Sequence, residues 1–219
     1  DLFELSYTTN FIKEQNWNAV WESSFEPVIV DNKCTVKASF HKGLPRTKYT
    51  IKIDPKMAFG TGHHETTSLM IRMMLNMEKE IKGIQVLDMG CGTGILSILA
   101  AKMKAATPVH AIDIDQTAVN SALENNYKNR VGDKIKTLCG DASLLQMGKY
   151  DLILANINRN ILLEDMSTYV RSMRPGGRLI VSGFYEEDII MLQTQATKCG
   201  LKYVCHDTKG KWAAIKFQL

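Results

Sequence analysis

The sequence has no long hydrophobic run. No stretch among its 219 residues approaches the roughly 20 consecutive apolar residues that a membrane-spanning helix requires. The most apolar segments, around Ile95 and Ile153, are interrupted by polar or charged residues within a few positions. We therefore expect no membrane-spanning segment. The composition, with 45% hydrophobic and 23% charged residues, is typical of a globular protein with a sizeable core.

Runs of basic residues are also missing. The 27 Lys and Arg residues exceed the 23 Asp and Glu residues by only four, and no five or six basic residues are consecutive. Basic arms that bind nucleic acids usually contain such runs. We therefore expect no direct nucleic-acid binding, and charge alone indicates no partner.

Cysteine pairs of the C-x-x-C type are absent, which removes the usual zinc and redox signatures. The cysteines are odd in number and scattered, at positions 34, 91, 139, 199 and 205. Reduced thiols in a cytoplasmic protein are the simplest interpretation. The first residues, DLFELSYTTN, contain neither an initiator Met nor a secretory signal, so we expect the chain to begin inside a longer polypeptide.

Strand-like and helix-like segments alternate along most of the chain. Apolar runs bounded by turn residues occupy 85–89, 109–114, 150–155 and 178–182, and helical segments follow at 94–104, 116–129, 158–173 and 186–198. A further strand ends before Asp141, and two more lie at 201–206 and after Gly210. This order predicts an α/β fold with a doubly wound, mostly parallel, seven-stranded sheet that ends in an antiparallel C-terminal hairpin.

The most informative stretch is VLDMGCGTGILSILA, an apolar strand followed by Gly90, Gly92, Gly94 and a helix. Glycines there allow a sharp turn close to a ligand, and the helix N-terminus offers free N–H groups. A dinucleotide fingerprint would require a glycine at position 95, which is Ile, and no Lys-Ser or Lys-Thr closes a phosphate-binding P-loop. The pattern favours a nucleotide-type site, although a purely structural turn remains an alternative.

Four aspartates lie at or just after predicted strand ends near this turn. Asp113 ends the neighbouring strand, where a carboxylate can accept hydrogen bonds from both ribose hydroxyls, whereas Asp115 is better placed as a helix N-cap. Asp141 lies where an adenine edge would sit, or is simply an acidic turn residue. Asp88 is either a strand-end carboxylate or a partner for the ammonium of a bound amino acid. A ligand with ribose and an amino-acid ammonium is S-adenosylmethionine.

The acidic-x-G-x-G-x-G motif resembles that of the Rossmann-like class I methyltransferases. The segments DPKMAFGTGHHETT, ANIN, NWNAVWESSFEPVIV and GKWAAIKF are similar to the bacterial ribosomal protein L11 methyltransferase family from about residue 16 onward. The resemblance implies methylation of lysine and N-terminal amines of ribosomal protein L11. It also implies a remnant of an N-terminal substrate domain, with linker and lead-in, at 1–45, and a catalytic domain at 46–219.

The one expected catalytic residue is Asn156, which we expect to orient the amine as well as contact the cofactor. The expected cofactor-binding residues are Phe59, Gly60, Thr67, Asp88, Gly90, Gly92, Asp113, Asp141 and Asn156. Phe59 and Gly60 belong to a loop that the resemblance places over the cofactor. Nothing in the sequence indicates the oligomeric state.

Alternatives remain for both the site and the function. The His63-His64-Glu65 triplet has metal-ligand residue types, but adjacent side chains diverge, so we expect no metal site. Arg159 is expected to be solvated surface.

The turn Asn156-Ile157-Asn158-Arg159 departs from the Asn-Pro-Pro-Tyr turn of many relatives, which weakens a nucleobase-methylating interpretation. An RNA or small-substrate methyltransferase and a non-catalytic cofactor-binding, ribosome-associated module are the competing functions.

Overall fold

A seven-stranded sheet forms the centre of the computed structural model, which describes residues 26–54 and 65–219. Its strands are β4 (Val86–Met89), β5 (Val109–Asp113), β6 (Ile135–Cys139), β7 (Tyr150–Asn156), β8 (Met173–Tyr185), β9 (Lys202–Lys209) and β10 (Trp212–Gln218). They are arranged in the order β6-β5-β4-β7-β8-β10-β9. The first five strands in this order pair in parallel, and β10 pairs antiparallel with both β8 and β9. The predicted sheet and its C-terminal hairpin are confirmed.

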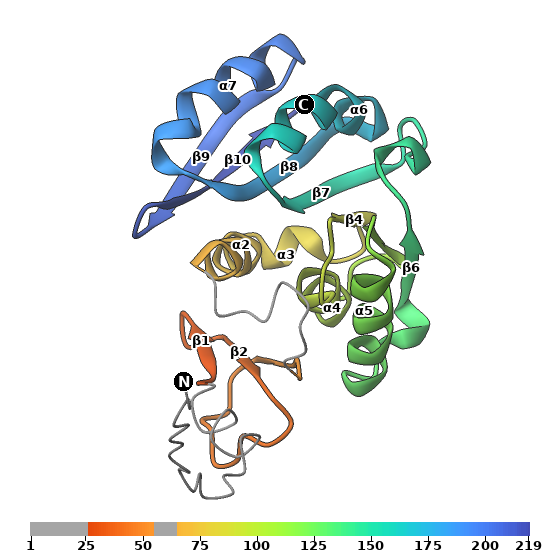
Figure 1. The fold of residues 1–219 in the computed structure, drawn as a ribbon, viewed down its shortest axis with the longest axis vertical. Helices are drawn as coiled ribbons and strands as arrows, with labels where there is room; N and C mark the ends of the chain where they lie inside the picture. The colour runs from red at the N-terminus through yellow and green to blue at the C-terminus, as the bar shows by residue number, and fades with distance from the viewer. Residues whose placement is uncertain (1–25, 55–64) are drawn as a thin grey trace, which may run out of the picture.

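Helices cover both faces of this sheet. Figure 1 shows α6 (Arg159–Ser172) and α7 (Ile189–Lys198) on one face, and α2 (Glu65–Asn76), α3 (Glu78–Ile81), α4 (Ile95–Lys102) and α5 (Gln116–Lys128) on the other. Single-turn 3-10 helices lie at η1 (Gly132–Lys134), η2 (Ala142–Leu144) and η3 (Glu186–Asp188). Within the described part of the chain, no helix is long and apolar enough to cross a membrane.

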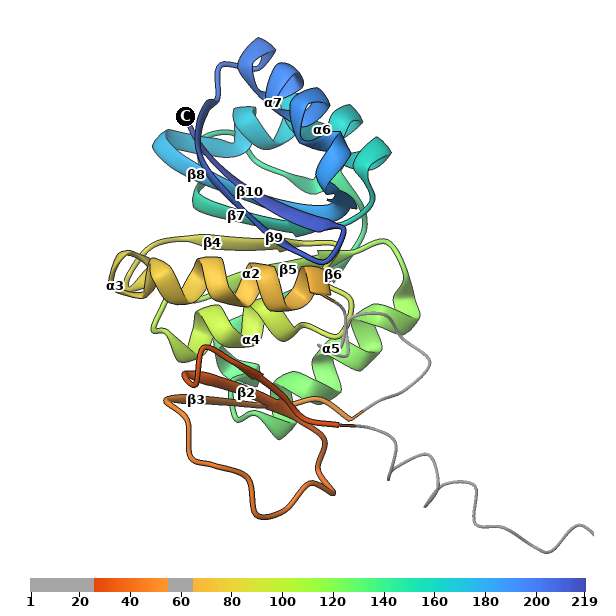
Figure 2. The ribbon, with the colours of Figure 1, turned by 90° about the vertical axis from the view of Figure 1, so that its left-hand side faces the viewer.

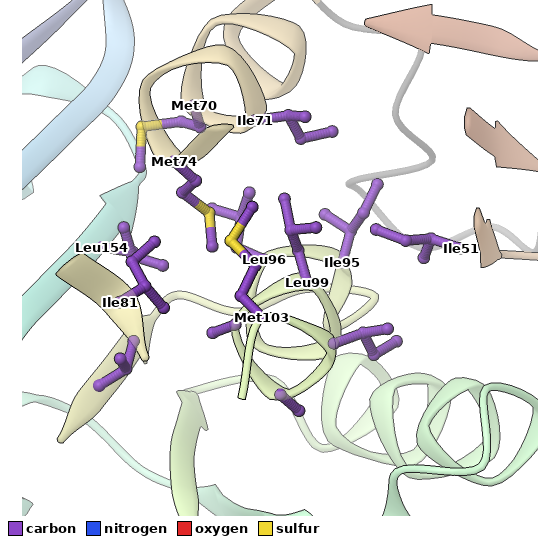
Figure 3. Close-up of a cluster of buried hydrophobic side chains, with 14 of the residues drawn as sticks. Ile51, Met70, Ile71, Met74, Ile81, Ile95, Leu96, Leu99, Met103 and Leu154 are labelled. Atoms are coloured by element: carbon purple, nitrogen blue, oxygen red, sulfur yellow. The ribbon is translucent and has the colours of Figure 1, made fainter. Parts of the chain in front are cut away.

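Alternating side chains of the central strands supply two hydrophobic cores. Along β7, Leu152 and Leu154 pack with α2 and α4, whereas Ile153 and Ala155 pack with α6 and α7. This alternation follows from the two-residue period of a strand that is buried on both faces. Figure 3 shows Met74 of α2 pointing toward Leu96 of α4 and toward Met103, the C-cap of that helix. The methionine-rich helical face is therefore core, as the sequence predicts.

A smaller sheet packs outside α4 and α5. It contains β1 (Val28–Val30), β2 (Cys34–Lys37) and β3 (Tyr49–Lys52), and Figure 2 shows it beyond the helices, away from the large sheet. The Asn129 side chain accepts a hydrogen bond from the Lys52 amide at 2.9 Å and donates to the Lys52 carbonyl at 2.7 Å, which fastens β3 to the end of α5. The expected domain boundary between residues 45 and 46 falls between β2 and β3, which pair with each other in this sheet. The boundary stays a prediction.

Candidate active site

The glycine-rich turn connects β4 to α4 at the carboxyl edge of the parallel strands. Gly90 and Gly92 have φ values of 67° and 53°, in the left-handed region that disfavours other residues. The Gly90 and Cys91 amides donate to the Ile112 carbonyl at 2.8 and 3.0 Å, which joins the turn to β5. The turn therefore has a fixed position beside the end of the neighbouring strand.

Asp113 lies at that strand end and contacts the turn directly. Its Oδ2 accepts a hydrogen bond from the Gly92 amide at 2.8 Å, and its Oδ1 accepts from the Asp115 amide at 3.0 Å. Each carboxylate oxygen has capacity for a second hydrogen bond. Asp115 caps α5 by accepting from the Thr117 amide at 2.8 Å, which confirms its expected N-cap role. The structure thus brings Gly92 and Asp113 into contact, and their binding of a cofactor stays a prediction.

Asp88 lies beneath the turn and is only 1% exposed. Its Oδ2 accepts a hydrogen bond from the amide of Ser97, in the first turn of α4, at 2.8 Å. An N-cap side chain usually accepts from such an amide, but the N-cap of α4 is Gly94, which has no side chain. Burial raises the pKa of Asp88 to about 7; the hydrogen bonds from Ser97 oppose this shift, and the charge of Asp113 adds to it. Asp88 therefore holds helix α4 to β4, and its contact with a cofactor ammonium stays a prediction.

Asn156 and Thr67 meet at the end of β7, although 89 positions separate them in the sequence. The Asn156 Nδ2 donates to the Thr67 Oγ1 at 3.4 Å, and the Thr67 residue is 1% exposed. Asn156 Oδ1 is buried and has no hydrogen-bond partner among the described residues. A buried acceptor without a donor costs roughly 1 to 3 kcal/mol, and a catalytic role is one of the reasons for which a protein retains such a group.

The turn after β7 also reaches the glycine-rich turn. A Cβ atom at Gly90 would overlap Cγ2 of Ile157, so the Ile157 side chain covers the Gly90 backbone. Sequence reasoning treated this turn only as a departure from a known motif and missed Ile157. The available signal was an apolar residue directly after Asn156, at the carboxyl end of a central strand.

Asp141 lies after β6 and lines a groove of about 620 Å³. Ile114 from the β5 edge and Ile161 from α6 line the same groove. Asp141 Oδ1 accepts from the Ser143 amide at 2.9 Å, and hydrogen bonds from Ser143 lower the Asp141 pKa. The groove combines apolar walls with acceptor groups, a chemistry that suits a flat heteroaromatic ring, and the adenine contact of Asp141 stays a prediction.

Two expected cofactor contacts, Phe59 and Gly60, lie outside the described residues, as do His63 and His64. Glu65 begins α2, where a carboxylate is favoured by the helix dipole. Across residues 26–54 and 65–219, no three potential metal ligands cluster. All five cysteines fall in these ranges and are free thiols.

The chain is similar to several known proteins along most of its length. A family model described as "Ribosomal protein L11 methyltransferase (PrmA)" matches residues 1–219. The ribosomal protein L11 methyltransferase of Bacteroides thetaiotaomicron is 50% identical over 216 residues, which cover 98% of this chain and 76% of that relative. The protein of the same name from Clostridium botulinum is 34% identical over 210 residues, covering 95% of this chain and 66% of that relative.

Solved structures agree with the sequence matches. A crystal structure of ribosomal protein L11 methylase from Lactobacillus delbrueckii subsp. bulgaricus superposes with a TM-score of 0.79 at 28% identity, covering 88% of this chain and 98% of that chain. M. jannaschii TYW2 in complex with AdoMet, at 18% identity and a TM-score of 0.51 over 66% of this chain and 74% of its own, shares the fold. The chain belongs to the ribosomal protein L11 methyltransferase family and is an S-adenosylmethionine-dependent methyltransferase.

Proposed function

We propose that the chain transfers methyl groups to lysine side-chain amines and the N-terminal amine of ribosomal protein L11. The names of the relatives support L11 as the substrate. An amine as the group that receives the methyl is supported by Asn156 Oδ1, a buried hydrogen-bond acceptor without a partner in the described structure. A neutral amine retains N–H groups that can donate to this oxygen while its lone pair remains free.

The residues at the carboxyl edge fit S-adenosylmethionine. Gly90 and Gly92 contribute no side chains of their own to this turn, and Asp113 has acceptor capacity left on both oxygens for ribose hydroxyls. Thr67 and Asn156 lie at the end of β7, on the other side of β4 from Asp113. When bound, the cofactor supplies a methyl group already activated by a sulfonium. Phe59, Gly60, Asp88 and Asp141 are further proposed contacts.

The protein's contribution to the reaction is mainly alignment. Asn156 is uncharged and cannot remove a proton, so its proposed role is to hold the neutral amine in line with the methyl group. The amine must lose its proton before attack, and solvent can accept that proton. Repeated methylation of one amine needs only that the amine turn and present its lone pair again. No nucleophilic side chain is required.

Methyl transfer from tritiated S-adenosylmethionine, measured with L11 and with ribosomal RNA as acceptors, tests this proposal. We expect label in L11 only, and the Asn156→Ala variant should reduce its rate on the order of 10- to 100-fold. Asn120→Ala, the same substitution at an exposed position of α5, is the matched control and should leave the rate unchanged.

Other outcomes would favour the competing functions. Label in RNA rather than in L11 would support an RNA methyltransferase. Cofactor binding without any S-adenosylhomocysteine production would support a non-catalytic, ribosome-associated module. A cytoplasmic location, where newly made ribosomal proteins are found, is part of this proposal.

A further inference from the structure

Strand β8 contains an irregularity beside the turn that carries Asn156. Its pairing with β10 changes register between Ala213 and Ala214, which pair with Phe184 and Ser182. Gly183 is therefore the extra residue of a β-bulge, and its φ of 98° lies in the left-handed region. Bulges of this kind are frequent next to active sites, where they redirect the chain.

The backbone of Ile157 occupies the space that the bulge leaves open. A Cβ at Gly183 would overlap the Ile157 carbonyl oxygen and lie 2.7 Å from its carbonyl carbon and 3.0 Å from its nitrogen. The Ile157 amide also donates to the Ser182 carbonyl at 3.1 Å. Because these contacts involve rigid backbone, a side chain at position 183 would have to displace the residue that directly follows Asn156.

A second attachment fastens the other end of the same turn. Arg159 Nη1 contacts Asp188 Oδ1 at 2.6 Å, and Asp188 is only 6% exposed. Asp188 Oδ2 accepts from the Tyr185 amide at 3.2 Å, at the end of β8. The Arg159 side chain is 40% exposed, as expected of a surface residue, but its guanidinium also pairs with a nearly buried carboxylate, which sequence reasoning missed. The turn from 156 to 159 is thus held to β8 and η3 at two points.

We propose that Gly183 and the Arg159–Asp188 pair are positioning residues for methyl transfer, because they fix the turn that places Asn156. This inference rests on the proposed role of Asn156 and identifies the residues that set its position. Gly183 leaves room for the Ile157 backbone because it has no side chain, and the ion pair attaches Arg159, at the end of the turn, to Asp188. Neither is required to touch the cofactor or the amine.

Gly183→Ala tests the first attachment, with Gly200→Ala as its matched control. Gly200 has a φ of 88°, so both substitutions introduce a similar backbone strain, but a Cβ at position 200 meets nothing within 4 Å. We expect both variants to unfold at lower temperature, while only Gly183→Ala reduces kcat for L11, on the order of 10-fold or more. Equal kcat values for Gly183→Ala and the wild type would overturn the inference.

A double-mutant cycle separates this inference from the proposed function. If Gly183 acts through Asn156, adding Gly183→Ala to Asn156→Ala should lower kcat little further. A full additional loss in the double variant would contradict positioning through Asn156. An unchanged rate for Asn156→Ala alone would instead remove the proposed role of that residue.

Arg159 variants provide a second test that avoids a backbone clash. We expect Arg159→Gln to lower kcat several-fold with a smaller change in KM, and Arg159→Lys, which keeps a positive charge for Asp188, to recover most of the loss. Equal and wild-type kcat values for both Arg159 variants would show that the ion pair has no positioning role.

Discussion

At the scale of single residues, two neighbouring aspartates illustrate how the same side chain takes different roles. Asp88 and Asp113 occupy adjacent parallel strands near the glycine-rich turn. Asp88 is 1% exposed and bonded to helix α4, whereas Asp113 is partly exposed and accepts from two backbone amides of turns. The sequence pattern could place both at the same edge but could not show that Asp88 is buried and Asp113 only partly so.

Asp113→Ala should weaken S-adenosylmethionine binding by roughly 1.5 to 3 kcal/mol, because charge-assisted hydrogen bonds to ribose are lost. Asp115→Ala is the control. It removes the cap of α5 and should cost about 1 kcal/mol of stability, with a much smaller effect on binding. Calorimetric titration measures both, and equal losses of affinity would contradict the assignment of Asp113.

Asp88→Asn should change how stability depends on pH. The folded-state pKa of Asp88, about 7, lies above its ordinary value of 3.8, so the folded protein binds more protons between these values. The contribution of Asp88 to stability is therefore fully present below about pH 4 and is lost as the pH rises through about 7. Asn cannot ionise, so the variant should gain stability relative to the wild type across this interval.

Urea unfolding at about pH 5 and about pH 8 measures that difference. We expect the stability of Asp88→Asn minus that of the wild type to be more positive at the higher pH. A difference that is the same at both values would show that Asp88 does not titrate with a raised pKa in the folded protein.

For helices and strands, the bounds could be predicted where apolar residues recur at a regular spacing. The helices following β4, β5 and β7 begin and end within two residues of their predicted bounds, because long apolar patterns determine them. Strand β8 extends from 173 to 185, well beyond the predicted 178–182, because its ends contain Pro, Gly and charged residues. The bulge at Gly183 depends on pairing with β10, which local sequence does not encode.

Asn129→Ala should separate β3 from α5. The change removes two hydrogen bonds to the Lys52 backbone and leaves both backbone groups without these partners, so the free energy of unfolding should fall by about 2 kcal/mol. Asn120→Ala, at an exposed position of the same helix, should change stability far less. Chemical denaturation of both variants checks the difference, and equal stabilities would contradict the role of Asn129 as a connection between β3 and the end of α5.

At the scale of the whole molecule, distant segments converge on α2. Arg72 of this helix pairs with Asp31, in the turn between β1 and β2, at 3.3 Å and with Asp207 of the C-terminal hairpin at 2.9 Å. The same helix presents Thr67 to Asn156. Helix α2 thereby connects the small sheet, the hairpin and the active-site edge. The apolar face of α2 could be predicted from the sequence. The contacts of Arg72 and Thr67 could not, because they join segments that are far apart in the chain.

In the proposed function, the carboxyl edge of the parallel strands aligns an amine of L11 with the methyl group of S-adenosylmethionine. Tandem mass spectrometry of L11, after incubation with the cofactor and this protein, tests the claim most directly because it identifies the modified atoms. We predict methyl groups on lysine side chains and on the N-terminal amine, formed much more slowly by Asn156→Ala. Methyl groups on other atoms of L11, or equal rates for the variant and the wild type, would contradict the account.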